Sequence, residues 1–141
     1  MAIRWDKFTV KSQEAIQAAN EIASQNGNPE VLPVHLLAAL LQDREGIVVP
    51  VLTKLGVNTA SIEAQAADLI GRMPKVSGGG AMQALLSSAG QKLLDQATKE
   101  ADRFKDEYVS TEHILLAMAR EKGNEAYQLL ISAGEIGRAH V

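Results

Sequence analysis

Cysteine is absent from the 141-residue sequence, which excludes disulfide bonds and thiolate metal sites and is compatible with the reducing, cytoplasmic location that we expect. Only 4% of the residues are aromatic, whereas Ala and Leu are abundant, and this balance favours helices over sheets. No apolar run approaches the roughly 20 residues that cross a bilayer, and no apolar signal-peptide segment follows the first residues. The net charge is −3 without a cluster of Lys and Arg, so neither a membrane nor a nucleic acid is an expected partner.

An internal repeat with a period of 78 positions organises the chain. His35 aligns with His113, and the residues around this pair align without a gap. A fixed period of this length indicates one supersecondary unit that is used twice. Two like modules packed together also create a seam, which is a natural place to bind a partner. Identical residues at this spacing include Gln13/Gln91, Ala19/Ala97, Ala23/Ala101, Val31/Val109, Leu37/Leu115, Ala39/Ala117, Leu52/Leu130 and Gly56/Gly134.

In the first copy, apolar residues recur with the 3.6-residue period of helices that bury one face. Thr9 is typical of a helix N-cap, Gly27 of a helix end, and Pro33 of the first residue of a helix. The predicted helices of this copy cover about 10–26, 33–42, 48–55 and 59–73.

The second copy repeats the plan, and its predicted helices cover about 87–104, 111–120 and 125–133. Phe104 is expected to face inward, and Gly134 is expected to close the last helix. Residues beyond Gly134 are not expected to continue as a helix. The eighth helix that the symmetry demands is therefore expected to be absent or cut short.

The sequence thus predicts an all-α fold of two pseudo-repeated four-helix modules, the second one expected to be truncated, packed as one compact domain over 1–141. No segment shows the alternation of a convincing strand. Repeat one covers about 7–73, a Gly-rich linker 74–84, and repeat two about 85–136. The three consecutive glycines of the linker, Gly78 to Gly80, cannot be helical. We expect residues 137–141 to be a tail added to the natural chain.

His35 and His113 are the obvious candidates for a metal or catalytic site. Metal sites require further ligands at close spacing, such as His-x-x-x-His, and the sequence has none. We expect each ring to play a structural role between an apolar helix and a polar neighbour. Serines such as Ser110 are present, but no G-x-S-x-G motif accompanies them, which argues against a small helical hydrolase. We therefore expect no catalytic residue and no metal site.

Three stretches of the sequence resemble a known family. They are FTVKSQEA at 8–15, RMPKVSG at 72–78, and KDEYVSTEH at 105–113. In this order and at this spacing they resemble the Clp repeat domain at the N-terminus of double-ring AAA+ chaperones, and above all its ClpB disaggregase branch. The resemblance covers about residues 3–134.

The resemblance implies a domain that does no chemistry itself and captures unfolded or aggregated polypeptide for delivery to an ATP-driven ring. The parent chain is expected to form a hexamer that works with an Hsp70-type chaperone, and this domain alone to be a monomer. The sequence contains no phosphate loop of the form G-x-x-x-x-G-K-[ST]. We therefore expect no cofactor in this segment and ATP in the absent AAA+ modules. The alternative is an adaptor-docking domain, as in the protease-coupled ClpA and ClpC branches.

Three polar residues, Thr9, Asp106 and Glu112, match positions that the ClpB family uses to handle substrates. Each also has a plain structural interpretation, because Thr9 can cap a helix, Asp106 can begin a turn, and Glu112 can complement a helix dipole. The two interpretations are compatible for each residue.

The apolar part of the site is expected from residues left partly exposed at the seam, because such a patch with a polar rim suits a client-binding surface. Leu94, Ala97 and the 111–115 helix are the candidates in the second copy, and Leu36 and Leu40 in the first. The predicted substrate-binding set is Thr9, Leu94, Asp106, Glu112 and His113.

One position departs from the ClpC branch, whose members carry Glu before the histidine in both copies. That pair resembles a site for phosphorylated arginine. Here Val34 stands in the first copy and only Glu112 remains, so we do not expect a symmetric pair of such sites.

Overall fold

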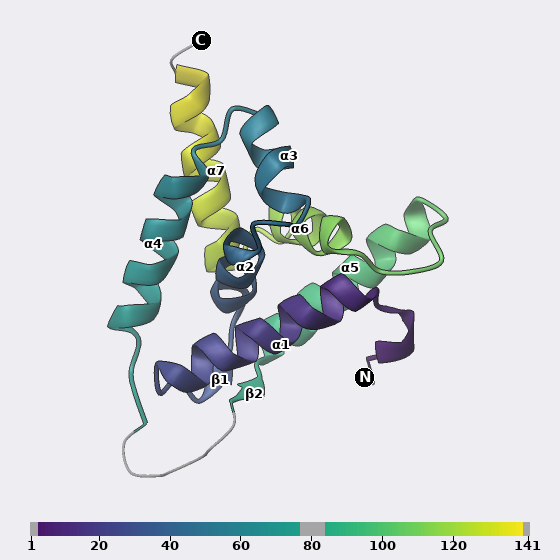
Figure 1. Ribbon diagram of the computed structural model, residues 1–141, viewed down its shortest axis with the longest axis horizontal. Coiled ribbons are helices and arrows are strands. Elements are labelled where there is room, and N and C mark those ends of the chain that lie inside the picture. The colour runs from purple at the N-terminus through teal and green to yellow at the C-terminus, as the bar shows by residue number, and fades with distance from the viewer. Residues whose placement is uncertain (1–2, 77–83, 140–141) are drawn as a thin grey trace.

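Helices make up nearly all of the regular structure in this computed structural model, which describes residues 3–76 and 84–139 (Figure 1). The all-α prediction is therefore confirmed. The predicted helix bounds of the first copy agree with the observed ones to within about two residues, the usual uncertainty of a helix end. The elements are η1 (Trp5–Lys7), α1 (Val10–Gln25), β1 (Glu30–Val31), α2 (Pro33–Gln42), α3 (Val48–Lys54), α4 (Thr59–Arg72), β2 (Leu85–Leu86), α5 (Ser88–Arg103), α6 (Thr111–Arg120) and α7 (Glu125–Ala139).

Helices α1, α4 and α5 begin at short polar residues whose side chains bind a free N–H group of the first turn. Thr9 Oγ1 accepts a hydrogen bond from the N–H of Ser12 (3.1 Å), and Ser87 Oγ accepts one from the N–H of Gly90 (2.9 Å). These two residues occupy equivalent positions in the two copies, so α1 and α5 start in the same way. Such a cap contributes about 1 kcal/mol to stability.

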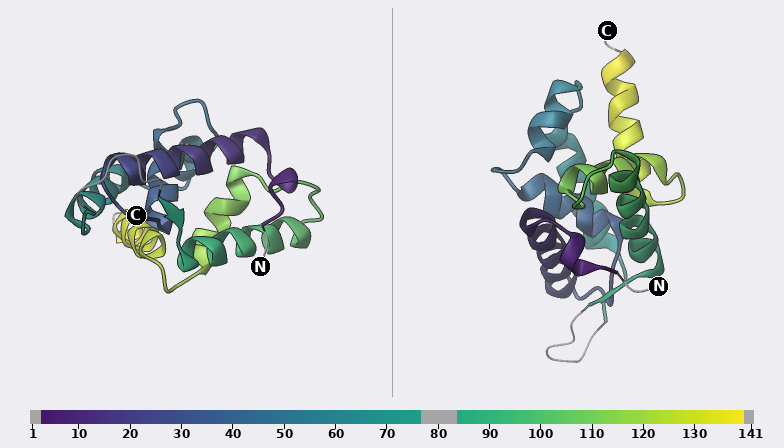
Figure 2. Two further views of the ribbon diagram at one scale, coloured as in Figure 1. Left: turned by 90° about the horizontal axis from the view of Figure 1, so that it is seen from below. Right: turned by 90° about the vertical axis from the view of Figure 1, so that its right-hand side faces the viewer.

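Helix α2 lies at the centre of the molecule, with α1 on one side and α4 and α7 on the other (Figure 1). Every residue of α2 except Gln42 is buried, as its continuous apolar sequence predicts. Figure 2 shows that α1 and α5 run in opposite directions along two sides of the molecule, with α2 and α6 between them. This arrangement is the one that two like modules adopt around a twofold pseudo-axis.

Backbone pairing joins each copy to the other. Phe8 forms a parallel bridge with Val109, in which Val109 N–H donates to the carbonyl of Lys7 (2.7 Å) and Thr9 N–H donates to that of Val109 (3.0 Å). The equivalent segments form the parallel pair β1–β2, with Val31 opposite Leu86. These strands are only two residues long, so they are too short to show the alternation of apolar and polar residues that predicts a strand. Each pairing therefore joins a backbone segment of one copy to a segment of the other copy.

The hydroxyl groups of two serines add hydrogen bonds to these backbone pairings. Ser12 Oγ donates to the Val109 carbonyl (2.9 Å), and Ser87 Oγ donates to the Val31 carbonyl (2.7 Å). Ser12 is fully buried and Ser87 is 3% exposed, so both bonds lie inside the protein. Each carbonyl also accepts a backbone N–H, from Thr9 or Ser87, so the serine hydroxyl supplies a second hydrogen bond that contributes about 0.5–1.5 kcal/mol.

The two copies differ at their ends. In the first copy Gly56 adopts a φ of 82°, α3 stops, and Asn58 caps the new helix α4 through a bond from Ser61 N–H (3.1 Å). In the second copy α7 continues through Gly134 to Ala139, so our prediction that a helix closes at Gly134 is wrong. The counterpart of Asn58 is Ile136, and isoleucine is disfavoured as an N-cap residue, which agrees with the continuation of α7.

The expected tail at 137–141 is thus helical as far as Ala139, and its last two residues lie outside the described part of the chain, as do Gly78 to Gly80. Within residues 3–76 and 84–139, no helix is both long and apolar enough to cross a membrane.

The tight contact between α5 and the β1–β2 pair gives a first test of this fold. A Cβ at Gly90 would lie 2.7 Å from Leu86 Cδ1 and 3.0 Å from the Val31 carbonyl oxygen. We expect Gly90→Ala to lower the free energy of unfolding by about 1–3 kcal/mol, because the paired backbone cannot move away cheaply. Urea denaturation of the purified chain measures this change.

Gly71→Ala is the matched control, because a Cβ at Gly71, near the end of α4, meets no atom within 4 Å. It should raise the free energy of unfolding by about 0.5–1 kcal/mol through the helix preference of Ala. Equal stability of Gly90→Ala and the wild type would contradict the close approach of the two copies.

Candidate functional site

The turn that ends α5 carries most of the predicted site. Lys105 adopts a left-handed conformation with a φ of 59°, and the N–H of Asp106 donates to the carbonyl of Ala101 (2.8 Å). This backbone arrangement closes the helix and directs the chain back toward Val109. It leaves Phe104, Asp106 and Tyr108 exposed on the surface.

His113 links this turn to the first turn of α6. Its Nδ1 accepts a hydrogen bond from the N–H of Ser110 (2.9 Å), and its Nε2 lies 2.8 Å from Oδ2 of Asp106. Because Nδ1 is an acceptor, the neutral ring carries its proton on Nε2 and donates it to Asp106. The ring is 6% exposed and packs beside Phe104, with ring centroids 6.5 Å apart.

His35 makes the same contacts in the first copy. Its Nδ1 accepts from the N–H of Leu32 (2.8 Å), and its Nε2 lies 3.0 Å from Oδ1 of Asn28. Burial lowers the pKa of His35 from 6.5 to about 4, so this ring is neutral at physiological pH. The structural role predicted for the two histidines is confirmed, since each one caps a helix and holds the preceding turn.

Ser110, His113 and Asp106 have the residue types of a catalytic triad, and Ser110 Oγ lies 3.0 Å from His113 Nδ1. The geometry is that of a capping box, because Nδ1 already accepts the backbone N–H of Ser110. The first copy builds the same arrangement with Leu32 in place of the serine. The described residues also contain no group of three or more His, Cys, Asp or Glu that could hold a metal ion.

The three predicted polar residues lie around the Phe8–Val109 pairing. Thr9 caps α1 and bonds Val109, Asp106 has a side chain that is 53% exposed, and Glu112 is exposed in the first turn of α6. Although the copies are far apart in sequence, the parallel pairing brings Thr9 beside the 106–112 segment.

The predicted apolar groove is wrong. Leu94, Ala97 and Leu36 are 0% exposed and Leu40 is 2% exposed, so none of them lines an open surface. The inward faces of α1, α2, α5 and α6 meet in one hydrophobic core and fill the seam between the copies. A site residue at Leu94 would require the core to open, and its observed role is packing.

Several large apolar side chains are nevertheless exposed, including Val10 and Leu85 next to the two pairings between the copies, and three aromatic side chains. Trp5 is 45%, Phe104 is 55% and Tyr108 is 49% exposed, and Phe104 was wrongly predicted to face inward. Phe104 is the C-cap of α5, where the chain leaves the helix and the amphipathic stripe ends. We call the exposed residues Phe104, Asp106, Tyr108 and Glu112 the α5–α6 surface. Phe104 and Tyr108 flank the Lys-Asp-Glu turn in the sequence, but helical periodicity does not show that they are exposed.

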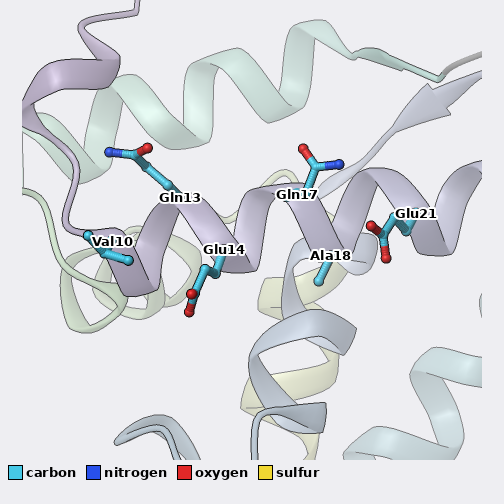
Figure 3. Close-up of a pocket in the computed structure, with 6 residues that line it drawn as sticks. All are labelled: Val10, Gln13, Glu14, Gln17, Ala18 and Glu21. Atoms are coloured by element: carbon cyan, nitrogen blue, oxygen red, sulfur yellow. The ribbon is translucent and has the colours of Figure 1, made fainter.

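A second feature is a hollow of about 400 Å³ along the outer face of α1. Figure 3 shows the six residues that line it. All six of the residues that line it belong to that helix, so the hollow is shallow. No histidine or basic group lies among them, and two are glutamates. The lining residues are Val10, Gln13, Glu14, Gln17, Ala18 and Glu21.

The fold and the site together define a class of protein, a duplicated helical domain with a polar surface beside one of the pairings between its copies. The family profile of the Clp repeat (R) N-terminal domain matches residues 7–133. The chain therefore belongs to this family.

Curated relatives of the chain are chaperones named ClpB. The protein from Bacillus cereus is 41% identical over 121 residues, which cover 84% of this chain and 14% of that protein. The protein from Rhodopseudomonas palustris is 36% identical over 129 residues, which cover 92% and 15%. The chain thus spans about one seventh of the length of these relatives.

Solved structures share the fold. The Hsp104 N-terminal domain from Candida albicans superposes with a TM-score of 0.78 at 24% identity, covering 91% of this chain and 82% of that one. The ClpV N-domain from Vibrio cholerae superposes with a TM-score of 0.77 at 20% identity, covering 96% and 80%. At these identities the likeness shows a common architecture.

The buried His35 predicts how stability depends on pH. The unfolded chain binds a proton at His35 near pH 6.5, whereas the folded chain does so only near pH 4. The stability that the neutral ring contributes is therefore fully present above pH 6.5 and is lost as the pH falls toward 4. Over that window the loss should amount to about 2–3 kcal/mol.

His35→Gln is the test, because Gln can make the same capping contact without titrating. The free energy of unfolding, measured in urea from pH 7 to pH 4, should fall less steeply for this variant than for the wild type. Parallel pH profiles would show that His35 titrates normally in the folded protein.

Proposed function

We propose that this domain binds unfolded or aggregated polypeptide for an ATP-driven disaggregase and performs no chemistry of its own. The observation that supports this function most directly is the α5–α6 surface of a domain similar to those of ClpB proteins. The half-exposed Phe104 and Tyr108 flank the turn that carries Asp106, and the exposed Glu112 lies in the first turn of the next helix. A surface of this kind accepts many different segments, because it needs only an apolar contact and a polar rim.

Weak binding is the expected behaviour of such a surface. Burial of apolar area supplies about 25 cal/mol per Å², and a docking polypeptide loses chain entropy at the same time. A small patch that contains two aromatic rings therefore supports micromolar or weaker affinity. Weak binding to many segments suits a domain that passes polypeptide on.

The proposal extends to the parent protein. Its ATP would bind in AAA+ modules beyond this segment, and the assembled protein would be a cytoplasmic hexamer that works with an Hsp70-type chaperone. Within this arrangement the present domain acts as an accessory module that is monomeric when isolated.

A second candidate function is the docking of one defined protein partner. One domain of the same fold has been solved as a complex of the ClpV N-domain with a VipB peptide, at a TM-score of 0.71 and 23% identity. A docking domain would bind a single folded or peptide partner with fixed stoichiometry and would ignore unfolded chains. Comparing a lysate pull-down with binding to an unfolded protein separates the two functions.

The predicted acidic residues provide a test. We expect the double variant Asp106→Ala with Glu112→Ala to weaken binding of fluorescein-labelled casein, a permanently unfolded protein, by about three- to tenfold. Each carboxylate at an exposed site contributes only about 0.2–1 kcal/mol. Fluorescence anisotropy of the 141-residue chain measures the affinity.

Asp68→Ala with Glu45→Ala is the control, because it removes the same charge from exposed positions outside the α5–α6 surface. It should bind casein as the wild type does. If both double variants weaken binding equally, the effect comes from net charge and not from the proposed surface.

A further inference from the structure

The turns that end α1 and α5 are two copies of one structure. Gly27 and Lys105 occupy equivalent positions and both adopt the left-handed conformation, with φ values of 70° and 59°. The next residue in each turn donates its N–H to a helix carbonyl, from Asn28 to Ala23 (2.9 Å) and from Asp106 to Ala101 (2.8 Å). The side chains of Asn28 and Asp106 then hold the equivalent histidines.

The turn of the first copy is covered by another part of the chain. Segment 74–76, which is not helical, lies across it, and the N–H of Val76 donates to the carbonyl of Gly27 (2.8 Å). Asn28 Nδ2 lies 3.4 Å from the carbonyl oxygen of Pro74. A Cβ placed on Gly27 would be 3.4 Å from Cβ of Lys75, so the segment is in van der Waals contact with the turn. The turn therefore has a shape and a hydrogen-bonding pattern that bind a short peptide.

The turn of the second copy is open. Among the described residues, no group donates to the carbonyl of Lys105, and His113 is the one partner of the Asp106 carboxylate. Phe104 and Tyr108, each about half exposed, stand where the first copy has the polar residues Asn26 and Glu30. The second turn thus exposes to solvent the same backbone arrangement, which Phe104 and Tyr108 flank.

One substitution changes what this second turn can accept. Asn28 donates a hydrogen bond to a peptide carbonyl, whereas the carboxylate of Asp106 can only accept. A carbonyl at that place would be repelled, and an N–H or a cationic side chain would be attracted. Residues 102–112 carry four acids (Asp102, Asp106, Glu107, Glu112) and two bases (Arg103, Lys105), so the local field also favours a cation.

We propose that the turn at 104–108 binds a non-helical peptide segment as the first copy binds residues 74–76, with a peptide N–H on the Lys105 carbonyl and a Lys or Arg side chain on Asp106. The inference rests on the proposed function and specifies its substrate, namely extended cationic segments of unfolded polypeptide. The first copy, with its own segment in place, does not compete for them.

Peptides built on residues 73–77 test this binding mode. Three fluorescein-labelled, end-blocked peptides are compared on the 141-residue chain, namely Met-Arg-Lys-Val-Ser, Met-Glu-Lys-Val-Ser, and the first of these with an N-methylated Val. The wild type should bind the Arg peptide about three- to tenfold more tightly than the Glu peptide, as expected for an exposed charge-assisted bond. N-methylation should weaken binding by about threefold or more, because the N–H is removed.

Asp106→Asn is the decisive variant. The first copy shows that Asn holds a histidine at this place, so the variant should fold, and its preference for Arg over Glu should drop below about twofold. Asp68→Asn, which loses the same charge on α4, should keep the wild-type preference. Equal binding of the two peptides by the wild type, or an unchanged preference in Asp106→Asn, overturns the proposal.

Casein binding distinguishes a failure of the proposed peptide site from a failure of the proposed function. If the wild type binds fluorescein-casein but shows no peptide preference and no effect of N-methylation, the turn is not the site while the proposed function stands. If the wild type does not bind casein, the proposed function itself fails. Should Asp106→Asn lose its fold by circular dichroism, the three peptides on the wild type still decide the question.

Discussion

The parallel pairing between the two copies is the interaction on which the rest of the structure depends. Val109 and Val31 are strand residues that lie just before α6 and α2, and each is paired by the segment that leads into α1 or α5 of the other copy. Because four backbone segments are used in this reciprocal way, neither copy can complete its own hydrogen bonding alone. The duplicated sequence consequently forms one body with a single main core.

Divergence between equivalent positions turned this symmetric framework into an asymmetric one. In the first copy the start of α2 is enclosed, since Val34 is buried against α4 and its N–H donates to Oε1 of Glu125 on α7 (3.2 Å). In the second copy the equivalent residue is Glu112, which faces solvent. The surface that we propose for binding therefore lies where the second copy exposes positions that the first copy covers.

The repeat, the all-α class, the first-copy helices and the capping role of Thr9 could all be predicted from the sequence, because they depend on neighbours within a few positions. The polar residues Thr9, Asp106 and Glu112 were found through resemblance, and their roles in binding stay predictions. Leu94 could not be placed correctly, because amphipathic periodicity shows that a residue faces inward and does not show whether a second module covers it. The buried Glu100, which pairs with Arg120 (Nε to Oε2, 3.0 Å) where the first copy has Ile22, has no periodic signature either.

The amino-acid sequence alone determined the local features of this protein, namely which segments form helices, where the helices begin, and that the arrangement of helices is repeated. The tertiary structure alone decided that side chains fill the seam, that Phe104 and Tyr108 face solvent, and that residues 74–76 cover one of two equivalent turns. The physical reason is that the exposure of a side chain depends both on its own position and on the segment that packs against it. A side chain is buried or open according to what distant parts of the chain bring against it, and no local pattern contains that information.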